Sequence, residues 1–163
     1  MQELDYIKSK VLDAAALQRT LAVWRLKSKK IVFTNGCFDI LHLGHVDYLA
    51  KASDLGDVLI LGLNSDASTK KLKGPHRPIN DQLQRSMIIA SLHFIDAVVL
   101  FDEDTPYELI KIVQPDVLVK GADYKPEQVA GYDIVMAKGG KVTTIEFLPG
   151  YSTTLIEKKI KTS

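Results

Sequence analysis

Apolar residues along the chain follow two patterns that alternate. Five short stretches are almost continuously apolar, which is typical of strands buried on both faces of a parallel sheet; they lie at residues 31–34, 57–63, 97–101, 116–119 and 141–145. Elsewhere, apolar residues recur at helical spacing, which predicts helices over residues 45–53, 81–93, 105–113, 126–138 and 153–160. Residues 4–26 also show helical spacing, whereas residues 65–78 are predicted to be a polar loop.

The alternation of strands and helices predicts an α/β fold with a Rossmann-like, doubly wound parallel sheet of about five strands. A closed eight-stranded barrel needs about 250 residues, more than the 163 present here. We expect a single domain over residues 1–163, with a helical extension at 1–28 and a catalytic core at 29–160. In an open sheet of this kind, ligands bind beyond the carboxyl ends of the strands, so the loops after the strands are the expected site.

Composition and charge narrow the function classes. Hydrophobic residues make up 46% of the chain and the formal net charge is +1, which gives no sign of a nucleic-acid-binding surface. Cys37 is the single cysteine, so no disulfide forms within the chain. No apolar run approaches the roughly 18 residues of a membrane helix. We expect a cytoplasmic protein without nucleic-acid or membrane partners, and self-association is left open.

The loop after the first strand carries the strongest chemical signal. His42 and His45 flank Gly44 at the start of a predicted helix, and helix N-termini bind phosphate through free N–H groups and the helix dipole. Glycine lets the backbone approach a ligand closely. The alternatives are ordinary surface or capping histidines, or a zinc site, but His76 and His93 do not supply a convincing zinc-ligand spacing.

The motif G-x-F-D-x-x-H-x-G-H of residues 36–45 resembles the signature of the nucleotidyltransferase superfamily that includes cytidylyltransferases and phosphopantetheine adenylyltransferase. The resemblance implies that His42 and His45 hold the phosphates of a nucleoside triphosphate during in-line attack on the α-phosphorus. It also places four residues of this loop beside the nucleotide, namely Asn35, Gly36, Phe38 and Gly44.

Charged residues after the second strand suit the same reaction, because negative charge builds on the α-phosphate and the leaving pyrophosphate. We predict catalytic roles for Lys73 and for Arg85, which lies in the following helix. The predicted substrate-binding residues are Asp39, Asn64, Asp66, Lys70 and Arg77, with Asp39 near the sugar phosphate or the metal. The alternative for the loop cations is a solvated, flexible charged loop.

Two further loops complete the expected site. Gly121 would permit a flat base to approach, and Asp123 could meet a sugar hydroxyl or a base amine. Ser152 and the hydroxyls after it lie where a helix begins, as caps, phosphate contacts or both, and the superfamily carries an S-[ST]-T-x-[IL] motif there. The predicted nucleotide-binding residues of these loops are Lys120, Gly121, Asp123, Tyr124, Ser152, Thr153 and Thr154.

The full set of motifs resembles, more specifically, the adenylyltransferases of ADP-heptose synthesis; it comprises residues 34–42, 63–68, 77–78, 101–106, 119–124 and 152–154. That resemblance implies transfer of AMP from ATP to D-glycero-β-D-manno-heptose 1-phosphate for lipopolysaccharide core assembly. Mg²⁺ would accompany ATP without a direct protein cage, and the sugar-kinase activity would lie on a separate chain.

Two other functions remain open. One is a CTP-dependent cytidylyltransferase that acts on glycerol 3-phosphate or a similar alcohol phosphate, since its first and last loops would look alike. The other is a non-catalytic nucleotide-binding module. A redox Rossmann enzyme is disfavoured because the chain has no G-x-G-x-x-G motif.

Overall fold

The fold of residues 2–162 is described by a computed structural model. The described residues contain five strands, which are β1 (Ile31–Gly36), β2 (Val58–Asn64), β3 (Ala97–Phe101), β4 (Val117–Gly121) and β5 (Lys141–Ile145). The α-helices of these residues are α1 (Glu3–Ser9), α2 (Ala14–Leu26), α3 (Leu43–Ser53), α4 (Asp66–Lys73), α5 (Gln82–Ala90), α6 (Tyr107–Val113), α7 (Tyr132–Ala137) and α8 (Thr153–Thr162). A short 3₁₀ helix, η1 (Pro126–Gln128), precedes α7. No helix within residues 2–162 has the length and apolar character needed to cross a membrane.

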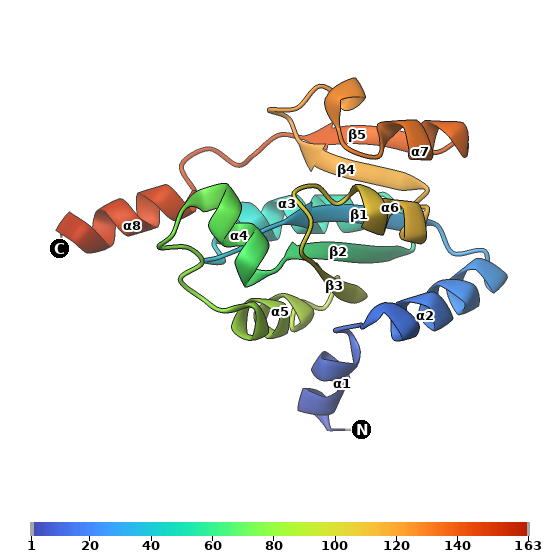
Figure 1. Cartoon of the computed structure of the whole chain (residues 1–163), viewed down its shortest axis with the longest axis horizontal. Coiled ribbons are helices and arrows are strands. Elements are labelled where there is room, and N and C mark those ends of the chain that lie inside the picture. The colour runs from blue at the N-terminus through green and yellow to red at the C-terminus, as the bar shows by residue number, and fades with distance from the viewer. Residues whose placement is uncertain (1, 163) are drawn as a thin grey trace.

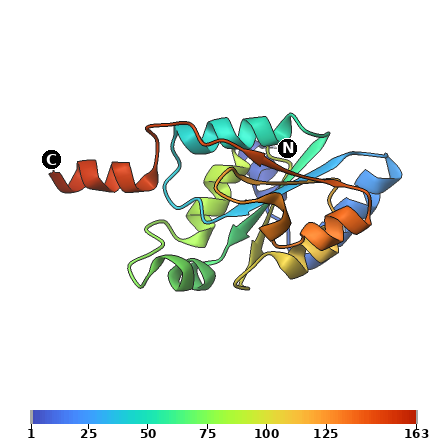
Figure 2. The ribbon, with the colours of Figure 1, turned by 90° about the horizontal axis from the view of Figure 1, so that it is seen from above.

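The strands form one parallel sheet in the order β3-β2-β1-β4-β5 (Figure 1). Helices cover both of its faces (Figure 2). The core on one face includes residues of α2, α6 and α7, and the core on the other includes residues of α3 and α5. The predicted α/β fold is therefore confirmed. After β1 the chain winds outward to β2 and β3, and later returns beside β1 to form β4 and β5, so ligands are expected at the carboxyl ends of β1 and β4.

Residues 66–73 form helix α4, so the prediction of a polar loop was wrong over this part of the segment. Ser65 caps the helix by accepting a hydrogen bond from the N–H of Ser68 at 3.1 Å. Asp66 lies in the first turn and three lysines lie in the last turn, where their charges complement the helix dipole. Helix α4 is therefore stabilised by its cap and by the charges at its ends. The spacing of apolar residues, on which the sequence prediction relied, does not detect such a helix.

The helix predicted over residues 126–138 is divided into η1 and α7. Gly131 separates the two elements with a φ of 89°, a backbone conformation that other residues rarely adopt. A Cβ atom at this position would also lie 2.7 Å from Cγ2 of Ile110. By contrast, the predicted cap at Asp81 is confirmed, since its carboxylate accepts from the N–H of Gln84 at 2.8 Å.

The N-terminal extension contains more than helices. Residues 10–12 run along the edge of β3, where Val98 donates to the carbonyl of Lys10 at 2.8 Å and Leu12 donates to the carbonyl of Val98 at 2.9 Å. The ammonium of Lys10 is buried and donates to the carbonyl of Leu92. At the other end of the chain, α8 extends away from the sheet (Figure 1).

Candidate active site

A cleft of about 620 Å³ lies at the carboxyl ends of β1 and β4, within the usual size range of small-molecule sites. We call it the carboxyl-end cleft. Most of the predicted site residues line it, namely Asn35, Gly36, Phe38, Asp39, His45, Asn64, Lys73, Arg77, Lys120, Gly121, Asp123, Tyr124, Thr153 and Thr154. The predicted residues that do not line it are His42, Gly44, Asp66, Lys70, Arg85 and Ser152. The sheet therefore gathers loops that are far apart in sequence into one site.

The two histidines of the first loop lie together at the N-terminus of α3. Their rings stack with centroids 3.7 Å apart and an interplanar angle of 21°. His42 is the residue before the first turn, and His45 lies inside that turn. The ring of Phe38 meets His45 edge-on at 5.0 Å. This stack fixes the imidazoles at a helix end whose N–H groups and dipole favour phosphate.

The surroundings of the two imidazoles lower the pKa of each. Burial lowers the pKa of His42. For His45, burial and the neighbouring charge of His42 lower the pKa to about 4, and the carbonyl of Ile40 opposes that shift. The buried Nδ1 atoms of both rings and Oδ1 of Asn35 have no hydrogen-bond partner among residues 2–162. Because buried polar groups are normally satisfied, these atoms mark the place where a polar ligand would complete the structure.

The glycines of this loop make room for its own rings. A Cβ atom at Gly44 would lie 3.1 Å from Nδ1 of His42, and one at Gly36 would lie 2.7 Å from the Phe38 ring. Phe38 itself turns the chain with a φ of 45°. In the structure these glycines admit the aromatic and imidazole side chains that shape the site, and the close approach of a ligand to them stays a prediction.

The carboxylate of Asp39 accepts hydrogen bonds from other parts of the protein. It accepts hydrogen bonds from Arg77 Nη1 at 2.6 Å and from the backbone N–H groups of Ile79 and Asn80 at 2.9 Å. Burial alone would raise its pKa, but these donors outweigh burial and hold the pKa below its ordinary value. Asp39 thus holds the loop of residues 77–80 while it lines the cleft, and its contact with sugar phosphate or metal stays a prediction.

The side chain of Arg85 also points into the protein interior. Its guanidinium is fully buried and donates to the carbonyls of Cys37, Asn64 and Asn80 at 2.7–2.9 Å. It also pairs with Asp66 at 2.7 Å. The sequence predicted that Arg85 and Asp66 face substrate, but the structure makes them partners that join the ends of β1 and β2. Arg85 is accordingly a positioning residue.

The remaining predicted residues divide between the cleft and its surroundings. Lys73 lines the cleft and is exposed, whereas Lys70 lies outside its walls. Burial lowers the pKa of Lys120, although the charges of Asp123 and Cys37 oppose this shift. The ammonium of Lys120 lies 5.3 Å from the centre of the Tyr124 ring. Ser152 accepts from the N–H of Leu155 at 3.1 Å, so the predicted cap of α8 is confirmed.

Sequence reasoning missed two aromatic residues of the cleft. Phe147 is 54% exposed and packs against Gly121, where a Cβ atom would lie 2.2 Å from its ring. Tyr48 lies 5.8 Å from Phe147 and its hydroxyl is 2.8 Å from that of Thr34. Burial raises the pKa of Tyr48 to about 12, with Thr34 opposing the shift and Asp123 adding to it. An exposed aromatic soon after the last strand was the available signal for Phe147, while Tyr48 resembled an ordinary core position.

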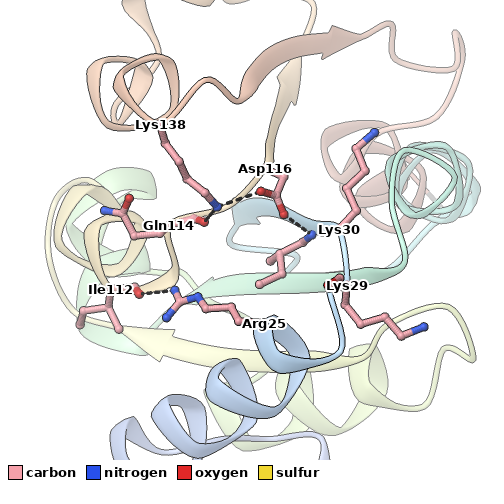
Figure 3. A pocket seen from close by; sticks show the side chains of 9 residues that line it. Arg25, Lys29, Lys30, Ile112, Gln114, Asp116 and Lys138 are labelled. Carbon is pink, nitrogen blue, oxygen red and sulfur yellow. Dashed lines mark hydrogen bonds and ion pairs between the residues drawn. The ribbon is translucent and has the colours of Figure 1, made fainter.

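A larger hollow of about 780 Å³, the amino-end hollow, lies at the opposite end of the sheet (Figure 3). Arg25 donates to the carbonyl of Val113 at 2.9 Å, and Lys138 pairs with Asp116 at 2.8 Å. The ammonium ends of Lys29 and Lys30 point away from these groups (Figure 3). Arg25 and Lys138 therefore join helix and strand ends in the amino-end hollow. The buried Nδ1 atoms of His42 and His45, which have no partner among the described residues, lie at the other end of the sheet.

Paired histidines at the helix N-terminus that follows β1 are the arrangement expected from the first-loop motif, and the family model that describes cytidylyltransferase-like proteins matches residues 33–159. The chain therefore belongs to the cytidylyltransferase-like family, as the first-loop motif predicted. The chain is 58% identical over 144 residues to the bifunctional protein HldE of Campylobacter jejuni subsp. doylei, covering 88% of the chain and 30% of that relative. It is 61% identical over 135 residues to the bifunctional protein HldE of Nitratiruptor sp., covering 83% of the chain and 28% of that relative. The chain thus spans less than a third of the length of these relatives.

Solved structures agree with the fold. A lipopolysaccharide core biosynthesis protein from Thermoplasma volcanium has a TM-score of 0.59 and 27% identity, covering 74% of this chain and 97% of that one. Pantoate-beta-alanine ligase from Francisella tularensis has a TM-score of 0.61 at 18% identity, covering 93% of this chain and 76% of that one. The second likeness shows the fold alone.

Proposed function

We propose that this chain is a sugar-phosphate adenylyltransferase, which transfers AMP from ATP to D-glycero-β-D-manno-heptose 1-phosphate and releases pyrophosphate. The observation that carries the proposal is the stacked pair His42 and His45 at the N-terminus of α3, with unpartnered buried Nδ1 atoms and with His45 in the wall of the cleft. The similarity to HldE proteins and the ADP-heptose motifs support the choice of acceptor.

The chemistry needs positioning and charge stabilisation more than acid–base catalysis. A phosphate oxygen of the acceptor, already ionised near pH 7, attacks the α-phosphorus of ATP in line, and the bond to the bridging oxygen of pyrophosphate breaks. His42 and His45 would donate hydrogen bonds to the triphosphate, and Lys73 would neutralise charge that develops on the leaving group. No proton needs to be removed by the protein.

Mg²⁺ is proposed to enter with ATP. Within residues 2–162, no group of three or more histidine, cysteine or carboxylate side chains is arranged to hold a metal. This fits a cation carried mostly by substrate phosphates and water, which is how Mg²⁺ is commonly bound. Asp123 and Asn35 bring oxygen ligands to the wall of the cleft, and the buried Oδ1 of Asn35 has no hydrogen-bond partner among the described residues. When bound, Mg²⁺ would neutralise charge on the phosphates.

The nucleotide would lie along the loops after β4 and β5. Phe147 and Tyr124 present aromatic surface beside Gly121, which suits stacking of a flat base. Thr153 and Thr154 would contact phosphate at the start of α8. We further propose that the enzyme is cytoplasmic and that a sugar-kinase activity outside these 163 residues supplies the acceptor.

Pyrophosphate release by the purified protein tests the proposal. Each of the four nucleoside triphosphates is combined with Mg²⁺ and with either heptose 1-phosphate or glycerol 3-phosphate. We expect release with ATP and heptose 1-phosphate alone. Release with CTP and glycerol 3-phosphate alone would replace the proposal with the cytidylyltransferase alternative. Nucleotide binding without release from any pair would favour the non-catalytic module.

A further inference from the structure

Arg77 lies between two carboxylates that belong to different parts of the chain. Its Nη1 donates to Oδ2 of Asp39 at 2.6 Å, and its Nη2 lies 2.5 Å from Oε1 of Glu157 on α8. The side chains of Arg77 and Glu157 are 19% and 24% exposed, and Arg77 forms part of the wall of the carboxyl-end cleft. One guanidinium and two carboxylates leave this cluster with an excess negative charge, beside the place where phosphates are expected.

The two carboxylates are held very differently. Asp39 is 7% exposed and also accepts from two backbone N–H groups, so it is fixed in place. Glu157 has one ion-pair partner among the described residues, which is Arg77. The carboxylate of Glu157 belongs to α8, a helix that extends away from the sheet (Figure 1). Of the two partners of Arg77, Glu157 is therefore the one that can be exchanged.

A phosphate group is the natural replacement for Glu157. Arginine binds phosphate and carboxylate oxygens with the same planar set of donors. A phosphate that approached the cluster with Glu157 in place would be repelled by the excess negative charge. With Glu157 displaced, Asp39 and Arg77 balance each other, and Nη2 of Arg77 is free to donate to the phosphate.

We infer that Glu157 is a placeholder for the phosphate of the acceptor: it occupies Nη2 of Arg77 until the sugar phosphate binds and takes its place. The inference deepens the proposed function and rests on it for the identity of the acceptor. Glu157 lies one turn beyond Thr153 and Thr154 on α8. Arrival of the acceptor would thus release the helix that carries two of the expected nucleotide contacts.

Equilibrium binding of heptose 1-phosphate tests this inference without requiring turnover. Isothermal titration is carried out with Mg²⁺ and α,β-methylene ATP on the wild type and on Glu157→Gln, Arg77→Gln and the double variant. Glu108→Gln is the matched control, because it removes a carboxylate from an exposed pair with Lys111 on α6. Glu157→Gln is expected to tighten binding by about twofold to fivefold, the range that competition from a partly exposed ion pair represents.

The other variants have equally definite expectations. Arg77→Gln should weaken binding, Glu157→Gln should add nothing in the Arg77→Gln background, and Glu108→Gln should bind like the wild type. Unchanged or weaker binding by Glu157→Gln would overturn the inference. So would an equal gain in Glu108→Gln, a gain that persists without Arg77, or no binding by the wild type and Glu157→Gln alike.

Pyrophosphate release by the wild type is measured in parallel and reports on the proposed function separately. A protein that binds heptose 1-phosphate, and binds it more tightly as Glu157→Gln, but releases no pyrophosphate would retain the placeholder and lose the proposed catalytic activity. A protein that releases pyrophosphate but shows no gain in Glu157→Gln would keep the activity and lose the placeholder.

Discussion

Cations gather at both ends of the sheet, but their partners differ. At the amino-end hollow, Arg25 and Lys138 donate to carbonyls and a carboxylate that end or begin secondary structure. At the carboxyl-end cleft, Lys73 has no such commitment among the described residues, and the buried nitrogens of His42 and His45 lack partners. A concentration of positive charge therefore does not identify a site, whereas buried polar atoms without protein partners do.

The same distinction operates inside the carboxyl-end cleft. Arg85 is close to the site but uses its donors on backbone carbonyls and Asp66. Arg77 is intermediate, because one of its partners is fixed and the other is exchangeable. Substitutions at these positions should therefore separate loss of stability from loss of activity.

The largest effect is expected from Arg85→Ala. It leaves the carbonyls of Cys37 and Asn80 without their donor, removes one of the two donors to the carbonyl of Asn64, and breaks the pair with Asp66, so the free energy of unfolding should fall by about 3–5 kcal/mol. Urea unfolding measures this loss, and Arg19→Ala on the exposed side of α2 is the control. A stable Arg85→Ala protein without activity would instead return Arg85 to the catalytic group.

His42→Ala or His45→Ala should lower kcat for pyrophosphate release at least about a hundredfold, because donors aimed at developing phosphate charge are removed. Urea unfolding should show that each variant remains folded. His93→Ala, which changes an exposed histidine outside the cleft, should keep normal turnover. Near-normal kcat in either histidine variant of the first loop would refute the assigned roles.

Acid should destabilise the protein through His45 before the carboxylates contribute. The folded pKa of about 4 lies below the ordinary value of 6.5, so the unfolded chain takes up a proton first as the pH falls. The free energy of unfolding should therefore decline as the pH falls through 6.5 toward 4, with a loss of roughly 2 kcal/mol by pH 5. His45→Gln should flatten this decline; an unchanged slope would show that the imidazole is not held neutral.

The smallest effects are expected at the amino-end hollow. Lys138→Ala removes a half-exposed ion pair, and Arg25→Ala removes a donor to the last carbonyls of α6. Each should lower the free energy of unfolding by about 0.5–1 kcal/mol and leave kcat and KM unchanged. A selective rise in KM for either substrate would mean that this hollow takes part in binding and that the contrast between the two ends is false.

The strands and the position of the site could be predicted from sequence because both depend on local pattern. Apolar runs located β1 to β4. The last strand was located although only Val142 and Ile145 are apolar within it. The rule that ligands bind beyond strand ends located the loops. Helix α4 was missed because its stability comes from the Ser65 cap and from charges at its ends, without an apolar period.

Individual side-chain roles depended on contacts that no local pattern contains. Asp39 meets residues 77–80, and Arg85 meets the carbonyl of Cys37, so the sequence could show that these charged residues lie near the site but not which way they face. Phe147 was missed for the same reason, since its packing on Gly121 joins the ends of two neighbouring strands.

Residues 10–12 have a consequence for how the chain behaves among its neighbours. By pairing with Val98, they cover the outer edge of β3, a strand that is otherwise apolar along most of its length. Uncovered strands of this kind are templates on which other chains can add. A variant without residues 1–12 would retain every residue of the cleft. The unpaired edge of its β3 would be exposed, and other chains could pair with that edge and aggregate.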